Sequence, residues 1–491
     1  MQLNADAAYQ ALTARDARFD GLWFVGVTST RIYCRPICRV RTPKRENCRF
    51  FDTPAQAEAA AYRPCLKCRP EIAPGRDVRW TVMDASRTLA VQAAGQLDQH
   101  AASGDTPSLA ALAQRLGLSD RHLRRIFAAE HGVTPLQYLQ TRRLLLAKQL
   151  LTDTLLPISQ VALTSGFKSL RRFNAAFSDN YRMSPSRLRG AAAQDEPHGD
   201  GAVMVTLSYR APYDVDTLLR FIALRAIPGV EVVEGRTVRR SLRADTVAAS
   251  AGWLEVRFLP QAARVQLRFA PHWASASGRI VGAVRQWLDL DAAPHTIDAA
   301  LADLPGAPGL RLPGSLDAFE LAVRAILGQQ VSVAAARTLA RRVVERFGEP
   351  VATPWPGIDR AFPAPALMGS TALERIAELG IIRTRANAII ALAQAWPALA
   401  AQMRTQAPPE GLIAQLCALP GIGPWTAHYI AMRALGWPDA FPPNDVAVLK
   451  AMKQLFSTNS QREADKRAQA WRPWRAYAVL RLWNSLETQP S

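Results

Sequence analysis

Four of the six cysteines in this 491-residue chain are spaced like the ligands of a metal ion. Cys34 and Cys38 form a C-x3-C pair, and after 26 further residues Cys65 and Cys68 form a C-x2-C pair. Two such pairs, brought together by a fold, supply the four thiolates of a tetrahedral zinc site. The spacing predicts one structural zinc ion.

The alternative use of clustered cysteines is a disulfide framework, which is typical of small exported domains. Residues 1–20 are polar and lack the apolar core of a secretory signal, so we expect a cytoplasmic protein with reduced cysteines. Cys48 belongs to neither pair and is expected to be a free thiol. Because no apolar run approaches the roughly 18 residues that would span a bilayer, we expect no membrane partner.

The chain is strongly basic, with 60 Lys and Arg against 41 Asp and Glu and a net charge of +19. The first 190 residues hold 28 of the basic and 15 of the acidic residues, so they carry +13 and leave +6 for the rest. A chain of this charge usually binds a polyanion. Arg dominates the excess and suits phosphate, because its planar fork donates two parallel hydrogen bonds. The charge therefore favours a nucleic acid as the partner.

The residues around the cysteines match a known family. The stretches FDGLWFVGVTSTRIYCRPICRVRTPKRENCRFF (residues 19–51) and AYRPCLKCRP (residues 61–70) resemble the N-terminal domain of Ada-type bacterial adaptive-response regulators. In that family the first cysteine of the C-x3-C pair accepts a methyl group from a methylphosphotriester in DNA. The resemblance implies that Cys34 is the acceptor and that all four spaced cysteines bind zinc. It also implies four DNA contacts, at Thr30, Arg39, Arg41 and Arg63.

Methyl transfer would change the charge of such a site. Four thiolates on Zn²⁺ carry about −2, and converting one of them into a neutral thioether leaves about −1. The loss of one negative charge beside a polyanion should tighten DNA binding, so the site would act as a local electrostatic switch.

Two helical pairs follow the cysteine-rich region. The predicted helices cover residues 78–97, 109–116, 120–127, 136–151, 158–167 and 169–177. Ser108 is a suitable N-cap, and a short turn at residues 117–119 separates the helices of the first pair. Helix, glycine-containing turn and arginine-rich helix are typical of a helix-turn-helix, although a buried helical pair is the alternative for either copy alone.

Residues 108–189 as a whole resemble the AraC-type DNA-binding domain, including its closing FSDNYRMSPSRLR (residues 177–189). This agrees with the Ada-type resemblance, because in those regulators a domain of this type follows the zinc-binding domain along the chain. The candidates for groove and phosphate contacts are Arg121, His122, Arg125, Lys168, Arg171 and Arg172. Small and polar residues at 190–201 then predict a linker.

Beyond the linker, alternating apolar residues predict two strands, at 254–258 and 265–269, in a hairpin of a small α+β domain. Helices dominate from about residue 315, where Ser315 or Asp317 would cap a helix whose apolar face includes Phe319.

The sequence Leu-Pro-Gly-Ile-Gly at 419–423 lies between two helical patterns and predicts a helix-hairpin-helix. Gly421 and Gly423 would let backbone N–H groups approach a phosphate closely, although an ordinary interhelical turn is the alternative. Asp445 follows Gly423 by 22 residues. A carboxylate at about this distance from such a hairpin resembles the helix-hairpin-helix DNA glycosylase superfamily.

Three segments resemble AlkA-type 3-methyladenine DNA glycosylases more specifically, within a match over nearly all of residues 203–487. They are VTLSYRAPYDVDTLL (205–219), GLRLPGSLDAFELAVRAILGQQVSVAAA (309–336) and WRPWRAYAVLRLW (471–483). The resemblance implies that Asp445 is the essential carboxylate, which would stabilise positive charge on the sugar as the N-glycosidic bond breaks. It also implies an aromatic pocket for a flipped base, formed by Trp425, Tyr429 and Trp483.

The chain also departs from its relatives. Trp425 stands where glycosylases that cleave the strand carry a lysine, so we expect hydrolysis of the N-glycosidic bond alone. Gln330 stands where AlkA-type members insert an apolar wedge into the duplex, which makes Gln329 and Gln330 the wedge candidates. Cys417 lacks the Pro-Cys-His-Arg context of guanine-methyl transferases, so no second methyl acceptor is expected.

These observations predict a multidomain α+β protein. We expect a small zinc-binding α/β domain (1–77), a linker helix with an all-α double helix-turn-helix domain (78–190), a small α+β domain (202–286) and an all-α helix-hairpin-helix glycosylase domain (287–491).

The function we expect is methyl transfer to Cys34 coupled to transcriptional activation, together with excision of alkylated bases such as 3-methyladenine. The alternative is a transcription regulator whose glycosylase-like half only binds DNA. A third hypothesis, a regulator that responds to a small molecule, has little support, because the sequence shows no ligand-binding domain. The expected partners are double-stranded DNA, at promoters and alkylated sites, and RNA polymerase. We expect a monomer.

Overall fold

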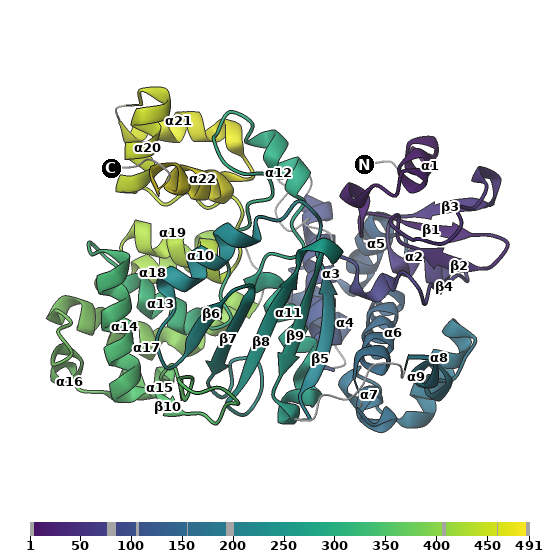
Figure 1. Ribbon diagram of the computed structural model, residues 1–491, viewed down its shortest axis with the longest axis horizontal. Helices are drawn as coiled ribbons and strands as arrows, with labels where there is room; N and C mark the ends of the chain where they lie inside the picture. Colours follow the sequence, from purple (N-terminus) through teal and green to yellow (C-terminus); the bar gives the residue numbers. More distant parts are fainter. Residues whose placement is uncertain are drawn as a thin grey trace. The chain divides into compact units, whose positions relative to one another are not determined.

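The computed structural model describes residues 4–75, 85–104, 108–154, 156–192, 201–404, 409–458 and 460–487 (Figure 1). The chain folds as two compact units. The first contains Met1–Ala211, Leu259–Gly282 and Leu290–Ala293, and the second contains Pro212–Phe258, Ala283–Asp289 and Pro294–Ser491. The expected domain boundary at residues 77 and 78, the start of the predicted helix 78–97 and most of the expected linker lie outside the described residues.

A four-stranded sheet with the strand order β3-β1-β2-β4 organises the beginning of the first unit. Its elements are α1 (Ala5–Thr13), η1 (Ala17–Phe19), β1 (Phe24–Val27), β2 (Ile32–Cys34), η2 (Arg45–Asn47), β3 (Cys48–Phe51), α2 (Pro54–Ala59), β4 (Arg63–Pro64) and η3 (Pro70–Ile72). Strand β1 runs antiparallel to β2 and β3, whereas β2 and β4 run parallel. The strands are short and the buried aromatic cluster around Phe24, Tyr33 and Tyr62 is small, so this sheet needs further support to be stable. The small α/β domain predicted from the sequence is confirmed.

Helices form the next part of the first unit. They are α3 (Ala85–Ser103), α4 (Leu109–Arg115), α5 (Asp120–His131), α6 (Pro135–Asp153), α7 (Ile158–Thr164), α8 (Leu170–Tyr181) and α9 (Pro185–Ala192). The pairs α4–α5 and α7–α8 are the two predicted helix-turn-helix units, joined by α6. Helices α5 and α8 begin at Ser119 and Ser169, each of which accepts the backbone N–H three residues ahead. Gly117 and Gly166 supply left-handed turns before these helices, with φ of +69° and +78°.

Helix α6 also packs against the zinc-binding domain through a buried carboxyl group. Thr141 on α6 donates its hydroxyl to Glu58 Oε2 at 3.0 Å, and Glu58 Oε1 accepts the hydroxyl of Tyr33 at 3.1 Å. Burial raises the pKa of Glu58 to about 8, although the hydrogen bonds from Thr141 and Tyr33 and the charge of Lys148 oppose this. The folded protein therefore favours a protonated Glu58.

Buried ion pairs complete the contact between α6 and the zinc-binding domain. Lys148 pairs with Glu71, and Arg69 pairs with both Glu71 (Nε–Oε1 3.0 Å) and Asp153 (Nη2–Oδ1 2.6 Å). Burial alone would raise the pKa of Glu71, but the charges of Lys148 and Arg69 bring it below its ordinary value. Removing one member would leave an unpaired buried charge, which typically costs about 3–5 kcal/mol. Buried ion pairs, in which each charge is neutralised by an opposite one, therefore hold the zinc-binding domain and α6 together.

Strands β5 (Val203–Ser208) and β9 (Arg264–Phe269) pair antiparallel in the first unit. Thr206 of β5 also bonds to α6: its carbonyl accepts from Gln149 Nε2 at 3.1 Å, and its N–H donates to Asp153 Oδ2 at 3.2 Å. Side chains of the helical domain therefore satisfy backbone groups of a strand that lies beyond the linker.

Arg210, two residues after β5, is 1% exposed and donates all five of its N–H groups to main-chain carbonyls. The five acceptors are the carbonyl oxygens of Asp20, Pro74, Gly75, Asp291 and Ala292. The Gly75 N–H in turn donates to Asp291 Oδ1 at 2.6 Å. One guanidinium thus joins two segments of the zinc-binding domain to the segment at 290–293.

The second unit combines antiparallel strands with many helices. Its elements are α10 (Val215–Arg225), β6 (Glu231–Glu234), β7 (Thr237–Leu242), β8 (Gly252–Leu259), α12 (Pro294–Ala300), α13 (Ala318–Leu327), α14 (Val333–Phe347), β10 (Glu349–Pro350), β11 (Arg360–Ala361), α15 (Pro365–Ser370), α16 (Leu373–Ala377), α17 (Arg383–Arg404), α18 (Pro409–Cys417), α19 (Pro424–Ala434), α20 (Val446–Phe456), α21 (Gln461–Ala468), η6 (Gln469–Trp471) and α22 (Arg475–Glu487). Helix α11 (Ser277–Trp287) and the 3-10 turns η4 (Pro260–Ala262) and η5 (Pro271–Ala276) complete the described elements.

The core of this unit surrounds α13, where Phe319 packs against Trp396 and near Leu416 and Ile430. Asp317 caps α13 by accepting two backbone N–H groups, which decides between the two caps that the sequence allowed. The strands predicted at 254–258 and 265–269 lie within β8 and β9. Among the described residues, no helix is both long and apolar enough to cross a membrane.

The raised pKa of Glu58 gives the first testable prediction. Because the folded state favours the protonated carboxyl, its stabilising effect is complete below the ordinary carboxyl pKa and is lost as the pH rises through about 8. We expect the melting temperature of the zinc-loaded protein to fall by about 5 °C between pH 6 and pH 8.5 because of this group. Glu58→Gln should remove that fall and be the more stable protein at pH 8.5, as measured by calorimetry.

Glu46→Gln is the matched control, because Glu46 is an exposed carboxylate of the same domain, paired only loosely with Lys44. It should melt like the wild type at every pH. A pH dependence of the same size in wild type and Glu58→Gln would contradict the assignment.

Candidate functional site

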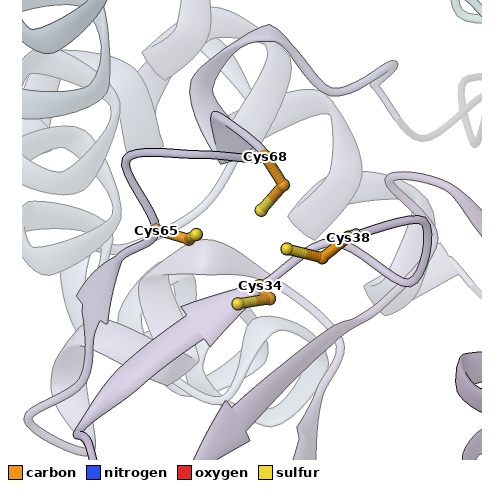
Figure 2. Close-up of side chains that lie close together, drawn as sticks. All are labelled: Cys34, Cys38, Cys65 and Cys68. Atoms are coloured by element: carbon orange, nitrogen blue, oxygen red, sulfur yellow. The ribbon is translucent and has the colours of Figure 1, made fainter. Parts of the chain in front are cut away.

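The sulfur atoms of Cys34, Cys38, Cys65 and Cys68 lie within 4.8 Å of one another and point toward a common centre (Figure 2). Cys34 ends β2 and Cys65 follows β4, so the parallel pairing of these strands places one cysteine from each pair side by side. None of the four forms a disulfide. With Zn–S distances of about 2.3 Å, a tetrahedral zinc site has sulfurs about 3.8 Å apart, so the cluster fits one zinc ion. Cys48 lies outside it, with its thiol directed at the Lys44 carbonyl.

Backbone N–H groups donate to three of these sulfurs, but among the described residues no N–H donates to Cys34 Sγ. The donors are Arg35 N–H to Cys68 Sγ (3.4 Å), Lys67 N–H (3.4 Å) and Cys68 N–H to Cys65 Sγ, and Val40 N–H to Cys38 Sγ. An N–H donor stabilises thiolate charge and so reduces the reactivity of the sulfur. Hydrogen bonding to Cys38 and the other sulfurs raises the pKa of the Cys34 thiol, so a divalent cation is what makes this sulfur a thiolate.

A buried ion pair beneath the cluster was not apparent from the sequence. Arg35 and Asp20 are each 2% exposed, and Arg35 Nε donates to Asp20 Oδ1 at 2.8 Å. Arg35 Nη1 also donates to the Cys68 carbonyl at 3.1 Å. The pair therefore fixes the loop that carries the last ligand. The one signal in the sequence is the position of Arg35, directly after Cys34.

The four residues expected to contact DNA near the zinc site lie at the surface. Thr30, Arg39 and Arg41 are exposed, and Arg63 is half-buried. None of these three arginines forms an ion pair with a carboxylate of the described residues, so their guanidinium groups are available for phosphate.

The candidate DNA-contact residues of the helical domain lie on and before the second helix of each pair. Arg121, His122 and Arg125 belong to α5, Arg171 and Arg172 to α8, and Lys168 precedes α8. All are exposed except His122, which is half-buried. The opposite faces of the helices are buried, through Leu123 and Phe127 on α5 and Phe173 and Phe177 on α8. The second helix of each pair thus has an exposed basic face, and its opposite, apolar face is buried in the core.

The predicted helix-hairpin-helix is formed by α18 and α19. Gly421 has φ +76°, and a Cβ at this position would lie 2.9 Å from the Cβ of Ala388, so only glycine fits. Gly423 is the N-cap of α19 and has open space around it. The free N–H groups at the start of α19 can therefore meet a phosphate.

Asp445 is the N-cap of α20 and is 6% exposed. Its Oδ1 accepts the backbone N–H of Val448 at 2.8 Å and the indole N–H of Trp483 at 3.1 Å. Its Oδ2 accepts the indole N–H of Trp425 at 2.7 Å. The structure thus brings the predicted carboxylate together with two of the three predicted pocket aromatics.

The third aromatic, Tyr429, lies one turn after Trp425 on α19. The rings of Trp425 and Tyr429 are stacked, with centroids 5.3 Å apart and an angle of 8° between their planes. The Tyr429 and Trp483 rings are 6.3 Å apart. Since the stacked pair leaves no space for a base between its rings, a flipped base must stack on an outer face.

Arg433 fixes Tyr429 from one further turn along α19. Its Nη1 donates to Tyr429 Oη at 2.7 Å, while Nε and Nη2 donate to the carbonyls of Pro313 and Gly314. Burial alone would raise the pKa of Tyr429, but the charge and hydrogen bond of Arg433 lower it below the ordinary value. Arg433 is a second residue that the sequence pattern did not single out.

The two wedge candidates face different ways. Gln329 Nε2 donates to the Gly421 carbonyl at 2.9 Å and to Thr426 Oγ1 at 3.0 Å, so this side chain braces the hairpin. Gln330 is exposed and has a left-handed backbone, with φ +54°. Only Gln330 of the two is directed to solvent.

Four domain families match successive parts of the chain. They are the metal binding domain of Ada (residues 7–71), a helix-turn-helix domain (112–191), the AlkA N-terminal domain (204–317) and the HhH-GPD superfamily of base excision DNA repair proteins (323–476). The order is that expected from the residues.

Full-length similarity extends over all four matches. A probable bifunctional transcriptional activator/DNA repair enzyme AlkA from Mycobacterium tuberculosis is 35% identical over 98% of this chain and 96% of its own length. DNA-3-methyladenine glycosylase 2 of Escherichia coli is 34% identical and covers 58% of this chain and 99% of its own. The bifunctional activator/repair enzyme Ada of E. coli is 36% identical over 29% of this chain and 37% of its own. The chain belongs to the family of bifunctional proteins that join an Ada-type zinc-binding regulator, with one zinc ion, to an AlkA-type DNA glycosylase.

Proposed function

We propose that this chain senses and repairs alkylated DNA by two separate reactions. Cys34 accepts a methyl group from a DNA methylphosphotriester, and Asp445 serves the hydrolytic release of alkylated bases such as 3-methyladenine. The first is supported by the four-sulfur cluster, in which Cys34 receives no N–H from the part of the chain that the structure describes. The second is supported by the buried carboxylate held beside an aromatic pocket. The domain limits follow the sequence: 1–77 accept the methyl group, 78–190 bind a promoter, and 202–286 with 287–491 excise the base.

Methyl transfer needs a sulfur that is ionised and whose nucleophilicity is not lowered by hydrogen bonds. Zinc, when bound, keeps the sulfurs deprotonated at neutral pH. Cys34 Sγ attacks the methyl carbon in line; the S–C bond forms as the O–C bond breaks, and the phosphodiester anion leaves with the electron pair. Cys68 is more exposed than the other three cysteines, so exposure does not select the acceptor. The N–H donated to Cys68 and the lack of one at Cys34 favour Cys34.

The transferred methyl group makes one sulfur a neutral thioether and removes about one negative charge from the DNA-facing side of the domain. Thr30, Arg39, Arg41 and Arg63 then hold phosphates with less opposition. The contacts in the grooves come from the α5 and α8 regions, at Arg121, His122, Arg125, Lys168, Arg171 and Arg172. We propose that the protein acts as a monomer in the cytoplasm and that promoter binding recruits RNA polymerase.

Base excision needs an anion beside the sugar and a place for the base. Asp445 stabilises the positive charge that develops at the anomeric carbon, and water completes the hydrolysis. Trp425, Tyr429 and Trp483 receive the flipped base, for which a cationic alkylated ring is well suited. Gly421 and Gly423 bind the backbone, and Gln330 is the wedge candidate that remains exposed. Because Trp425 replaces the lysine of strand-cleaving relatives, the glycosylase is monofunctional and leaves the strand intact.

The acceptor assignment is tested by mapping the methyl group. After incubation with DNA that contains methylphosphotriesters, mass spectrometry should find one added methyl on the peptide of Cys34. Cys34→Ala should abolish transfer because the nucleophile is gone. Cys48→Ala, the same change at a buried cysteine outside the cluster, should transfer normally. A methyl group on Cys68 would show that exposure, rather than hydrogen bonding, selects the acceptor.

The role of Asp445 is tested by release of 3-methyladenine from methylated duplex DNA. Asp445→Asn keeps the shape of the side chain but loses its charge, so the single-turnover rate should fall about 100-fold or more. Asp303→Asn is the matched control, because Asp303 also accepts an indole N–H, that of Trp471. It should act like wild type. No release by wild type would instead favour a regulator whose glycosylase-like half only binds DNA, and strand breaks without alkali would refute monofunctional action.

A further inference from the structure

Among the described residues, three N–H groups donate to the carboxylate of Asp445, and they are unevenly distributed over its oxygens. Oδ1 accepts from Val448 and Trp483, whereas Oδ2 accepts only from Trp425. A carboxylate offers about four acceptor positions, two on each oxygen. Oδ1 is therefore filled, and the remaining position lies on Oδ2. Any substrate atom or water that meets this carboxylate meets Oδ2, and the Trp425 N–H fixes the direction in which its free position points.

The indole of Trp425 is itself held in place along one face of α19. Trp425, Tyr429 and Arg433 follow one another at four-residue spacing, so their side chains are neighbours on the helix. Tyr429 stacks on Trp425, and Arg433 holds Tyr429 by its hydroxyl. Arg433, 8% exposed, is anchored to the carbonyls of Pro313 and Gly314. The direction of the Trp425 N–H is thus set by a chain of contacts that ends on main-chain atoms.

Trp483 approaches the carboxylate from a different helix, α22. Its N–H shares Oδ1 with the Val448 N–H, which belongs to the first turn of α20. Oδ1 would keep one donor if Trp483 lost its N–H, whereas Oδ2 would keep none if Trp425 lost its own. The two tryptophans are therefore unequal in their effect on the carboxylate.

We propose that Trp425 and, to a smaller degree, Trp483 are positioning residues for Asp445, and that their indole N–H groups fix the direction of its carboxylate. Their ring faces serve base binding, and their N–H groups serve the chemical step. This deepens the proposed excision reaction and rests on it.

The physical reason lies in the substrate. Positive charge develops on the sugar as the glycosidic bond breaks, and a carboxylate stabilises it best when its oxygens stay directed at the sugar. Hydrogen bonds to a charged group are worth more than hydrogen bonds to a neutral one, so the indole N–H groups hold the carboxylate firmly in one direction. Without the indole donors the same carboxylate would be free to rotate away from the sugar.

The experiment separates the ring from its N–H group. Trp425→Phe and Trp483→Phe keep an aromatic face but lose the donor, and β-(3-benzothienyl)alanine at position 425 keeps the bicyclic shape with sulfur in place of N–H. Trp471→Phe is the matched control, because it removes an indole-to-carboxylate bond at Asp303. Single-turnover release of 3-methyladenine is measured from pH 5 to pH 9, and the affinity for the same DNA is measured by titration.

We expect the rate to fall about 10- to 100-fold in Trp425→Phe and in the benzothienyl protein, and about 10-fold or less in Trp483→Phe. The DNA affinity of the benzothienyl protein and all properties of Trp471→Phe should stay at wild-type values.

Wild-type rates in the benzothienyl protein would overturn the proposal, and so would loss of DNA affinity without loss of rate. A wild-type protein that releases no base would instead refute the excision reaction itself, so the two failures are distinguishable.

Discussion

The two proposed reactions share one constraint: each needs an anion that faces DNA, which is itself a polyanion. The thiolate of Cys34 would serve methyl transfer, and the carboxylate of Asp445 would serve base excision. Near the four sulfurs, backbone N–H groups and basic residues offset the charge, together with zinc. Around Asp445, two indoles and a helix N-terminus do so. The arrangement of both sites follows from this requirement.

The two sites differ in the number of N–H groups that donate to the anion. At the zinc cluster, Cys34, the proposed acceptor, receives no N–H from the described residues, which leaves the charge of a nucleophile available. At Asp445, three N–H groups of the described residues donate to the carboxylate, which fixes the direction of an electrostatic stabiliser.

Much of the fold and of the site follows from local sequence. The zinc ligands were predictable because each pair lies within one turn, and the start of α4 was predictable because the Ser108 cap accepts the backbone N–H three residues ahead. The inward direction of the Gln329 side chain was not predictable from the sequence, because its partners on the hairpin are more than 90 residues away in the chain. The pairing of Arg35 with Asp20, and the edge-on contact of Trp425 with Asp445, likewise depend on packing that no spacing encodes.

Arg210 has a consequence for how such a protein can be divided. The family matches place it in the glycosylase part of the chain, yet three of its five carbonyl acceptors, at Asp20, Pro74 and Gly75, belong to the zinc-binding domain. A glycosylase fragment cut at the linker would lose these three acceptors, and water would solvate the guanidinium that they bury in the whole chain. The border between the family matches is therefore crossed by a buried contact that exists only in the joined protein.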